Sequence, residues 1–179
     1  MNLSRRRMLR IAGSSGLAVV AGSALAIGQE SPAFAAQKNW RWCVKCQGLW
    51  FFGNSKWGAC PASPNGHSID GSGNYSLLSS SDGGSGQTNW RWCFKCQGLW
   101  FFGNSSWGAC PASPNGHSID GSGSYKIEFA SVGGGQAGWR WCWKCQGLMF
   151  FGNSKLGACP ASSIGHGPEK SAVYQLRFA

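Results

Sequence analysis

The chain has 179 residues, a formal net charge of +10, and 28 Gly, 11 Trp, 10 Phe and 9 Cys. This composition excludes a large helical domain and a large aliphatic core, because Gly disfavours helices and long aliphatic side chains are few. It favours short strands and loops, in one compact domain or a few small ones, in which Trp and Phe supply most of the apolar burial.

The chain begins with an export-type sequence. Residues 4–10, SRRRMLR, precede a Gly-rich apolar stretch, and residues 33–35, AFA, form an A-x-A cleavage site. Residues 1–35 thus resemble a twin-arginine (Tat) signal peptide, whose Ser-Arg-Arg-x-Phe-Leu-Lys pattern matches at its Ser, both Arg and its Leu. The resemblance implies cleavage before Ala36, export through the Tat pathway, a secreted or extracytoplasmic location and no membrane attachment afterwards. An ordinary secretory signal and a retained anchor are the alternatives.

Charge after cleavage favours anionic partners without selecting one. Removal of residues 1–35 takes away four Arg and one Glu, so twelve Lys and Arg face five Asp and Glu and the formal charge becomes +7. This charge suits wall polymers, acidic glycans or nucleic acid. The basic residues form no run, however, so charge alone does not choose among these partners.

The remainder of the chain is a threefold repeat with periods of 50 and 49 residues. Residues 40–75 and 90–125 differ at three of 36 positions, whereas residues 139–174 differ from the second copy at twelve. The third copy is therefore informative, because what it keeps can be compared with what it changes. The expected units are repeat 1 (36–86), repeat 2 (87–135) and repeat 3 (136–179).

Each copy keeps three Cys and one His in the spacing C-x2-C-x13-C-x6-H, which uses every Cys and His of the chain. Three Cys cannot all pair as disulfides within a copy, and disulfides do not explain a recurring His. Three thiolates and one imidazole match a tetrahedral metal site. We expect three zinc ions per chain, with iron, or disulfides plus free thiols, as alternatives. The expected ligands are Cys43, Cys46, Cys60 and His67; Cys93, Cys96, Cys110 and His117; and Cys142, Cys145, Cys159 and His166.

The expected role of the zinc is structural. Four protein ligands leave no open position for a substrate. A unit of about 50 residues seldom folds on its own core, and a structural zinc offers about 10–16 kcal/mol of apparent binding free energy. With all His used as ligands, and with no Ser-His-Asp set, carboxylate pair or phosphate loop in the sequence, we expect no enzymatic activity.

Within each copy the pattern predicts β structure. In repeat 1, residues 40–42 (WRW) form a strand, residues 43–48 (CVKCQG) a metal knuckle, and residues 49–52 (LWFF) the returning strand. Pro and Gly then shape the loop that delivers His67, and residues 75–79 (YSLLS) close the unit as a third strand. The segments YKIEF and YQLRF close the other two units in the same way.

The knuckle and hairpin resemble a zinc ribbon, over the CxxC half of each repeat only, and the tandem unit resembles an uncharacterised repeat of secreted actinobacterial proteins. Residues 79–87 (SSSDGGSGQ) and 130–138 (ASVGGGQAG) have the composition of flexible joints. We therefore expect an all-β protein of three tandem zinc-stabilised β-hairpin repeats, with flexible linkers between the modules. A single pseudo-threefold β-trefoil-like domain is the alternative.

The aromatic residues fall into two groups. Two Trp positions become aliphatic in the third copy, which indicates packing: Trp50 and Trp100 correspond to Met149, and Trp57 and Trp107 to Leu156. The Trp-Arg-Trp segment is unchanged, and indole faces beside a guanidinium can stack on sugar rings or bases, with a core role as the alternative. The candidate ligand-binding residues are Trp40, Arg41, Trp42, Trp90, Arg91, Trp92, Trp139, Arg140 and Trp141.

From these features we expect a secreted, non-catalytic protein that binds envelope or extracellular polysaccharide at several sites, because repeated weak sites gain avidity on a polymer. A nucleic-acid-binding module, a protein-interaction module and a metal buffer are the alternatives. An acid lies three residues after each His, at Asp70, Asp120 and Glu169, where it can orient the imidazole or lie in a solvated loop.

Overall fold

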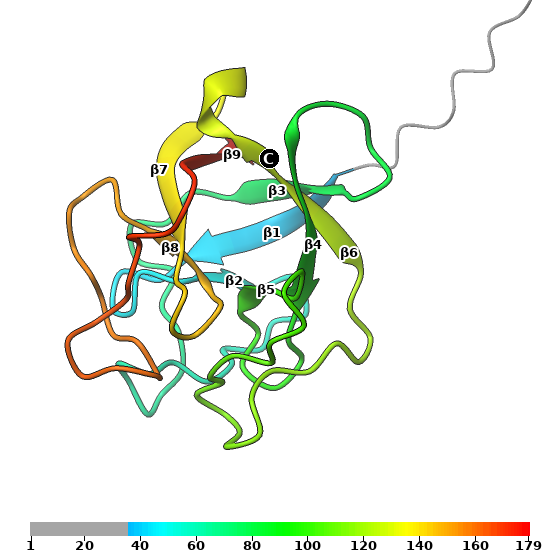
Figure 1. The fold of residues 1–179 in the computed structure, drawn as a ribbon. Coiled ribbons are helices and arrows are strands. Elements are labelled where there is room, and N and C mark those ends of the chain that lie inside the picture. Colours follow the sequence, from blue (N-terminus) through cyan, green and yellow to red (C-terminus); the bar gives the residue numbers. More distant parts are fainter. Residues whose placement is uncertain (1–35) are drawn as a thin grey trace, which may run out of the picture. The chain divides into compact units, whose positions relative to one another are not determined.

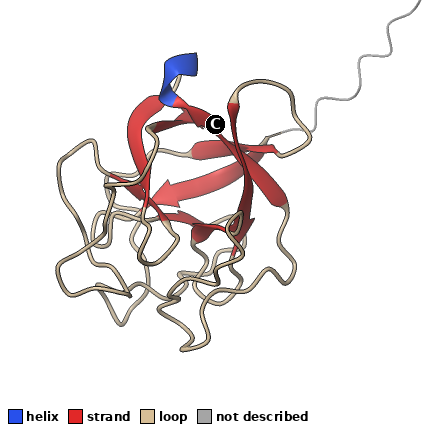
Figure 2. Ribbon diagram, viewed as in Figure 1, coloured by secondary structure: helices blue, strands red, loops and turns tan. Residues whose placement is uncertain are grey.

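The computed structural model describes residues 36–179, so the predicted export signal lies outside the described part of the chain. Residues 36–179 are all-β apart from one turn of 3₁₀ helix, η1 (Ala130–Val132), as Figure 2 shows. No helix in this part is long and apolar enough to cross a membrane. The strands are β1 (Gln37–Trp42), β2 (Leu49–Phe51), β3 (Tyr75–Ser79), β4 (Gly86–Trp92), β5 (Leu99–Phe101), β6 (Ser124–Phe129), β7 (Gln136–Trp141), β8 (Leu148–Phe150) and β9 (Tyr174–Phe178).

Each repeat contributes a hairpin and a closing strand, as the sequence pattern predicts. In repeat 1, β1 pairs with β2 on one side, with Trp40 opposite Phe51, and with β3 on the other, with Trp40 opposite Tyr75. The pairing of β1 with β3 is irregular between Gln37 and Trp40, where Asn39 has a φ of 70°. The same pairings recur in the other repeats, between β4, β5 and β6 and between β7, β8 and β9.

The three repeats share one sheet. Their closing strands pair with one another, β3 with β6, β6 with β9 and β3 with β9, which makes the sheet a nearly closed barrel (Figure 1). The predicted all-β fold with three tandem hairpin repeats is confirmed. The repeats are not separate modules on flexible linkers, however, because their closing strands pair across repeats and residues at both ends of the joint 79–87 belong to paired strands. The long loops between the second and third strands of each repeat gather at one end of the barrel, in the lower part of Figure 1.

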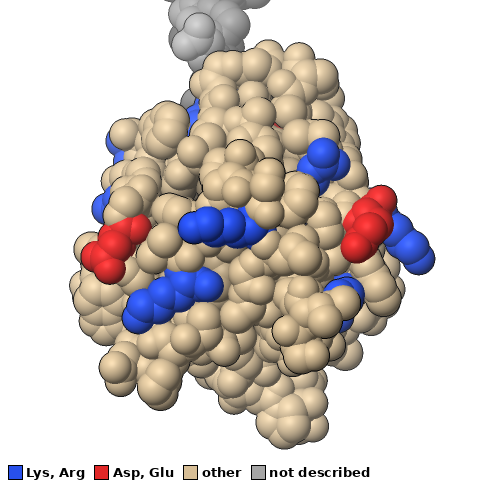
Figure 3. Space-filling model, turned by 90° about the vertical axis from the view of Figure 1, so that its left-hand side faces the viewer, with Lys and Arg blue, Asp and Glu red and all other residues tan. Residues whose placement is uncertain are grey.

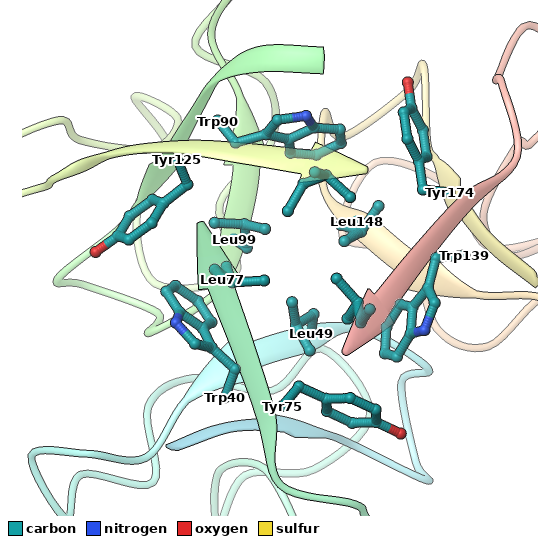
Figure 4. Packing of buried hydrophobic residues seen from close by; sticks show 12 residues of the cluster. Trp40, Leu49, Tyr75, Leu77, Trp90, Leu99, Tyr125, Trp139, Leu148 and Tyr174 are labelled. Atoms are coloured by element: carbon teal, nitrogen blue, oxygen red, sulfur yellow. The ribbon is translucent and has the colours of Figure 1, made fainter. Parts of the chain in front are cut away.

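A ring of aromatic side chains fills the barrel (Figure 4). The indoles of Trp40, Trp90 and Trp139 are fully buried around a centre of Leu side chains. Each indole meets the edge of a tyrosine of another repeat, with ring centroids 5.3 Å apart for Trp40 and Tyr125 and 5.4 Å apart for Trp139 and Tyr75. Burying one indole removes about 150–250 Å² from water, worth roughly 4–6 kcal/mol. The core therefore belongs to the three repeats together.

Candidate metal centres

The three Cys3His sets that the sequence indicates converge into three buried clusters. In each cluster the three Sγ atoms and one imidazole nitrogen lie within 4.8 Å of one another, and each cluster can hold one metal ion. All nine Cys of residues 36–179 are free and buried, and none forms a disulfide. The clusters are Cys43, Cys46, Cys60 and His67; Cys93, Cys96, Cys110 and His117; and Cys142, Cys145, Cys159 and His166.

The distances within a cluster fit a tetrahedral ion. In repeat 1 the sulfurs of Cys43 and Cys60 are 4.0 Å apart, and the Cys46 sulfur is 3.5 Å from Nδ1 of His67. Zinc bonds of about 2.3 Å to sulfur and 2.0–2.1 Å to nitrogen imply separations of about 3.8 Å between sulfurs and 3.5 Å between sulfur and nitrogen. Four protein donors at these positions complete the shell of a four-coordinate ion and place Nδ1 of the imidazole as the ligand atom.

The backbone of the knuckle is shaped to bring its two Cys together. The amide of Gln47 donates to the Cys43 carbonyl at 2.7 Å, and the amide of Cys43 donates to the Gly48 carbonyl at 3.0 Å. Gln47 has a φ of 67°, the left-handed turn that reverses the chain into β2. The amide of Ser68 donates to the Cys43 sulfur at 3.4 Å, and such bonds stabilise a thiolate.

The ionisable groups of each cluster shift one another's pKa values. Hydrogen bonds with Cys46 and Cys60 hold the pKa of Cys43 well below its usual range, whereas hydrogen bonds with Cys43 and Cys60, together with burial, raise the pKa of Cys46. Burial lowers the pKa of His67, but the Cys43 and Cys60 sulfurs outweigh burial and raise that pKa to about 9. A metal ion must displace the protons that remain on the imidazole and thiols, so its binding releases protons.

Each ligand imidazole is oriented by the neighbouring repeat. Nε2 of His67 lies 3.2 Å from the Cys96 carbonyl, Nε2 of His117 lies 3.3 Å from the Cys145 carbonyl, and Nε2 of His166 lies 3.2 Å from the Cys46 carbonyl. With Nδ1 on the metal, Nε2 carries the proton and donates to that carbonyl. Each metal centre is thereby connected to the knuckle of the next centre, and the three contacts close a ring.

Of the two alternatives for the acids Asp70, Asp120 and Glu169, the structure shows the solvated loop acid, and the carboxylates do not orient the imidazoles. The carboxylate of Asp70 accepts a bond from the Ser68 hydroxyl at 2.6 Å, and Asp120 accepts one from Ser118 at 2.6 Å. Glu169 accepts a bond from Nε1 of Trp143 at 3.0 Å. The acids lie on exposed loops beside the centres, because a backbone carbonyl of the next repeat already occupies the imidazole Nε2 position.

A second ring of contacts runs through the knuckle glutamines. The side-chain amide of Asn54 donates to Oε1 of Gln97 at 2.8 Å, and the amide of Phe51 donates to the Gln97 carbonyl at 2.9 Å. Asn104 makes the same contact with Gln146, at 2.9 Å. The ring closes through Asn153 and Gln47, also at 2.9 Å. The knuckle of each repeat is therefore held by the turn that follows the hairpin of the preceding repeat around the ring.

The two substituted Trp positions differ in burial. Trp50 and Trp100 are fully buried, as is Met149, and packing at this position is confirmed. Trp50 stacks on the His67 ring at 5.0 Å between centroids, and Trp100 stacks on His117 in the same way. The other position was expected in the core or hairpin and is exposed: Trp57, Trp107 and Leu156 have relative exposures of 47%, 46% and 40%.

The Trp-Arg-Trp segments do not form the exposed stacking surface that the sequence suggested. Their first Trp has no exposed face, because Trp40, Trp90 and Trp139 form the core. Their second Trp is half-buried against a Phe of another repeat, as when Trp42 meets Phe150 at 6.0 Å. The first Trp of each segment is thus corrected from a candidate binding residue to a core residue, while Arg41, Arg91, Arg140, Trp92 and Trp141 are half-buried.

Sequence reasoning missed Trp57 and Trp107 as surface residues, although a signal was present. Each follows a GNS turn and precedes a Gly, and Gly58 has a φ of +62°, in the left-handed region. Turn residues on both sides indicate a loop, where an aromatic side chain is exposed unless another element covers it.

No protein-family model, no curated protein and no solved structure matches the chain.

Proposed function

We propose that this protein is a secreted, zinc-stabilised, non-catalytic binding protein for envelope or extracellular polysaccharide. The single observation that carries the proposal is the pair of nearly half-exposed indoles, Trp57 and Trp107, at equivalent places on one domain. Flat aromatic faces on loops are the groups that stack on the apolar faces of sugar rings. Two such faces on one polymer chain gain avidity that neither has alone.

The donor set favours zinc over iron and a structural role over catalysis. Three thiolates and one imidazole in a tetrahedron are a usual closed shell for structural zinc. The buried clusters keep solvent and substrate away from the ion, because all twelve ligand residues are buried. Each ion supplies folding free energy to a barrel whose small repeats have limited cores of their own.

The charge distribution favours a polysaccharide over a nucleic acid. Three thiolates and one Zn²⁺ have a net charge of about −1, so three filled centres lower the formal charge of residues 36–179 from +7 to about +4. On the face seen in Figure 3, Lys and Arg are separated by uncharged surface and by acidic side chains. Nucleic-acid binding depends on many aligned phosphate contacts, which scattered charges supply poorly.

Metal content and retention on insoluble polymers test the proposal. The protein purified from the cytoplasm should contain close to three zinc ions and no titratable thiol until a chelator is added. It should be retained on at least one of peptidoglycan sacculi, chitin and cellulose, and the retention should persist at 1 M NaCl. Retention only on single-stranded DNA, with loss at moderate salt, would assign it to nucleic acid. No retention on any of the three polysaccharides contradicts the proposed function.

A further inference from the structure

A hollow beside the first metal centre has the groups of a sugar-binding subsite. Its volume is about 260 Å³, and it lies between the knuckle and the loop that carries His67. We call it the Trp57 hollow. It is lined by Lys45, Trp57, Asn65, Ser68, Ile69 and Asp70, together with the ligand His67.

The aromatic wall of the Trp57 hollow is held in place from behind. The Trp57 ring lies 4.9 Å from Phe52 and 6.1 Å from Trp50, measured between centroids, while 47% of the residue is exposed. The Trp57 carbonyl accepts a bond from the amide of the metal ligand His67 at 2.9 Å. The metal loop therefore fixes the indole, so stacking on it costs little ordering of the protein.

The polar groups of the hollow are also restrained. The Ser68 hydroxyl donates to one carboxylate oxygen of Asp70 at 2.6 Å, and the Lys45 ammonium donates to the Ser63 hydroxyl at 3.2 Å. The hollow thus combines one carboxylate, one ammonium and the amide of Asn65 around an indole. Its formal charges cancel, and its donors and acceptors match the hydroxyls of a neutral pyranose.

Repeat 2 carries the same set. Trp107 packs 5.1 Å from Phe102, the Lys95 ammonium donates to Ser113 at 3.2 Å, and Ser118 donates to Asp120 at 2.6 Å. The corresponding lining residues are Lys95, Trp107, Asn115, Ser118, Ile119 and Asp120.

Repeat 3 has lost most of this chemistry. Leu156 and Ile164 replace the Trp and Asn, and Gly167 replaces the Ser. A Cβ on Gly167 would lie 2.6 Å from Nε1 of Trp143, so the Trp143 indole covers this place. The Trp143 Nε1 donates to the carboxylate of Glu169. This acid corresponds to the loop acids of repeats 1 and 2, and its carboxylate is already hydrogen-bonded to the indole.

We infer that repeats 1 and 2 each hold a subsite for a neutral hexopyranose unit, formed by the residues around Trp57 and Trp107, and that repeat 3 holds none. The inference rests on the proposed polysaccharide binding and specifies where it occurs. It makes the protein bivalent, although its fold is threefold.

The test compares equivalent positions in the three repeats. On whichever of sacculi, chitin or cellulose retains the wild type, we expect Trp57→Ala or Trp107→Ala to weaken binding about 5- to 150-fold, and the double variant to remove it. Leu156→Ala in repeat 3 is the matched control and should bind as the wild type. Zinc content near three for every variant shows that folding is retained. Asn65→Ala with Asn115→Ala, which leaves both indoles in place, should also weaken binding.

Indole N–H signals in nuclear magnetic resonance spectra count the subsites directly. Trimers of N-acetylglucosamine and of glucose, both β-1,4-linked, are titrated into the wild type. The signals of Trp57 and Trp107 should shift with at least one trimer, while that of Trp143 should not. If the wild type is retained on a polymer but the double variant binds equally well, or if Leu156→Ala loses as much, the two-subsite inference is overturned and the proposed function stands. If the wild type is retained on no polymer, both fail.

Discussion

Repeats 1 and 3 can be compared at their metal loops. In repeat 1 the His67 imidazole stacks on the Trp50 indole and contacts a backbone carbonyl of repeat 2. In repeat 3 the His166 imidazole makes the same kind of contact to a carbonyl of repeat 1, but Met149 takes the place of the indole. The contacts that join the repeats are thus the same in both. The residues over the metal loop differ, since Trp57 and Asn65 correspond to Leu156 and Ile164.

The difference separates two requirements. A change in a contact that closes the ring leaves a buried polar group without a partner, at a cost of about 1–3 kcal/mol, and affects two repeats at once. A change on the exposed loop affects one repeat and costs little stability. The interior of repeat 3 is therefore constrained by its neighbours, while its surface is free to vary. The predictions below test this comparison.

The largest effect should come from metal removal. A structural zinc contributes about 10–16 kcal/mol, which is comparable with the whole stability of a small domain. Because the repeats share one sheet and their ligand imidazoles bond across repeats, chelation should unfold all three together. Circular dichroism, followed over a chelator titration at equilibrium, should show one unfolding transition for the three repeats, whatever the order in which the ions leave. Three separate transitions would mean that repeat 1 and repeat 3 fold independently.

The next effect concerns the core ring. Trp40→Ala and Trp139→Ala should each cost about 3–5 kcal/mol, and equally, because both remove a fully buried indole from equivalent places. Trp42→Ala, at a half-buried position, is the control and should cost less. Urea denaturation of the zinc-loaded protein measures all three. An equal loss of unfolding free energy for Trp40→Ala and Trp42→Ala would contradict the assignment of Trp40 to the core and Trp42 to a half-buried position.

A smaller effect should appear in the order of zinc loss. Repeat 3 lacks the indole over its imidazole, and Ser163 and Ile164 replace the Pro and Asn of the ligand loop, so its ion should leave first under chelation. Trp50→Met should bring repeat 1 closer to the rate of repeat 3, because it removes the indole but keeps the Pro and Asn of the loop. An aromatic pair is worth about 0.5–1.5 kcal/mol, which corresponds to about a 2- to 12-fold faster release.

Variants that replace one Cys by Ser in a single repeat assign each release phase to its site. Cys159→Ser should remove the fastest phase, and Cys60→Ser should leave it. Release from repeat 3 after the other two would contradict the predicted order, and an unchanged rate in Trp50→Met would remove the indole from its explanation.

The smallest effect should come from the ion pair between Arg177 and Glu128, 2.7 Å apart at the surface. The hydrogen bond from Arg177 lowers the pKa of Glu128 below its ordinary value of 4.5. Because the pKa of Glu128 is lower in the folded than in the unfolded chain, the ion pair stabilises the fold at pH values above the unfolded-state pKa. This stabilisation is lost as the pH falls through the folded-state pKa. Glu128→Gln should therefore lower the free energy of unfolding by a small, constant amount from pH 8 to 5. The difference from the wild type should shrink only below pH 4.5. Lys155→Gln is the surface control, and a difference that grows towards acid would reverse the sign.

The ligand sets and strands were accessible from the sequence because both are encoded locally. The spacing from Cys43 to His67 needs no knowledge of other repeats, and all three clusters form as predicted. The closing strands were also predicted, since residues 75–79 and 174–178 alternate with period 2 and match β3 and β9.

Only the tertiary structure decided what each repeat contacts. A repeated sequence is the same whether its copies pack together or stand apart, so pairing of β3 with β6 and β9 could not be deduced from it. The partner of His67 Nε2 is likewise a carbonyl of another repeat, and a backbone group has no sequence signature. Trp40 and Trp57 are both tryptophans of repeat 1, and Trp40 is buried while Trp57 is exposed, because Tyr125 of repeat 2 packs against Trp40. Burial depends on which surface meets which, and that is set by non-local packing rather than by local pattern.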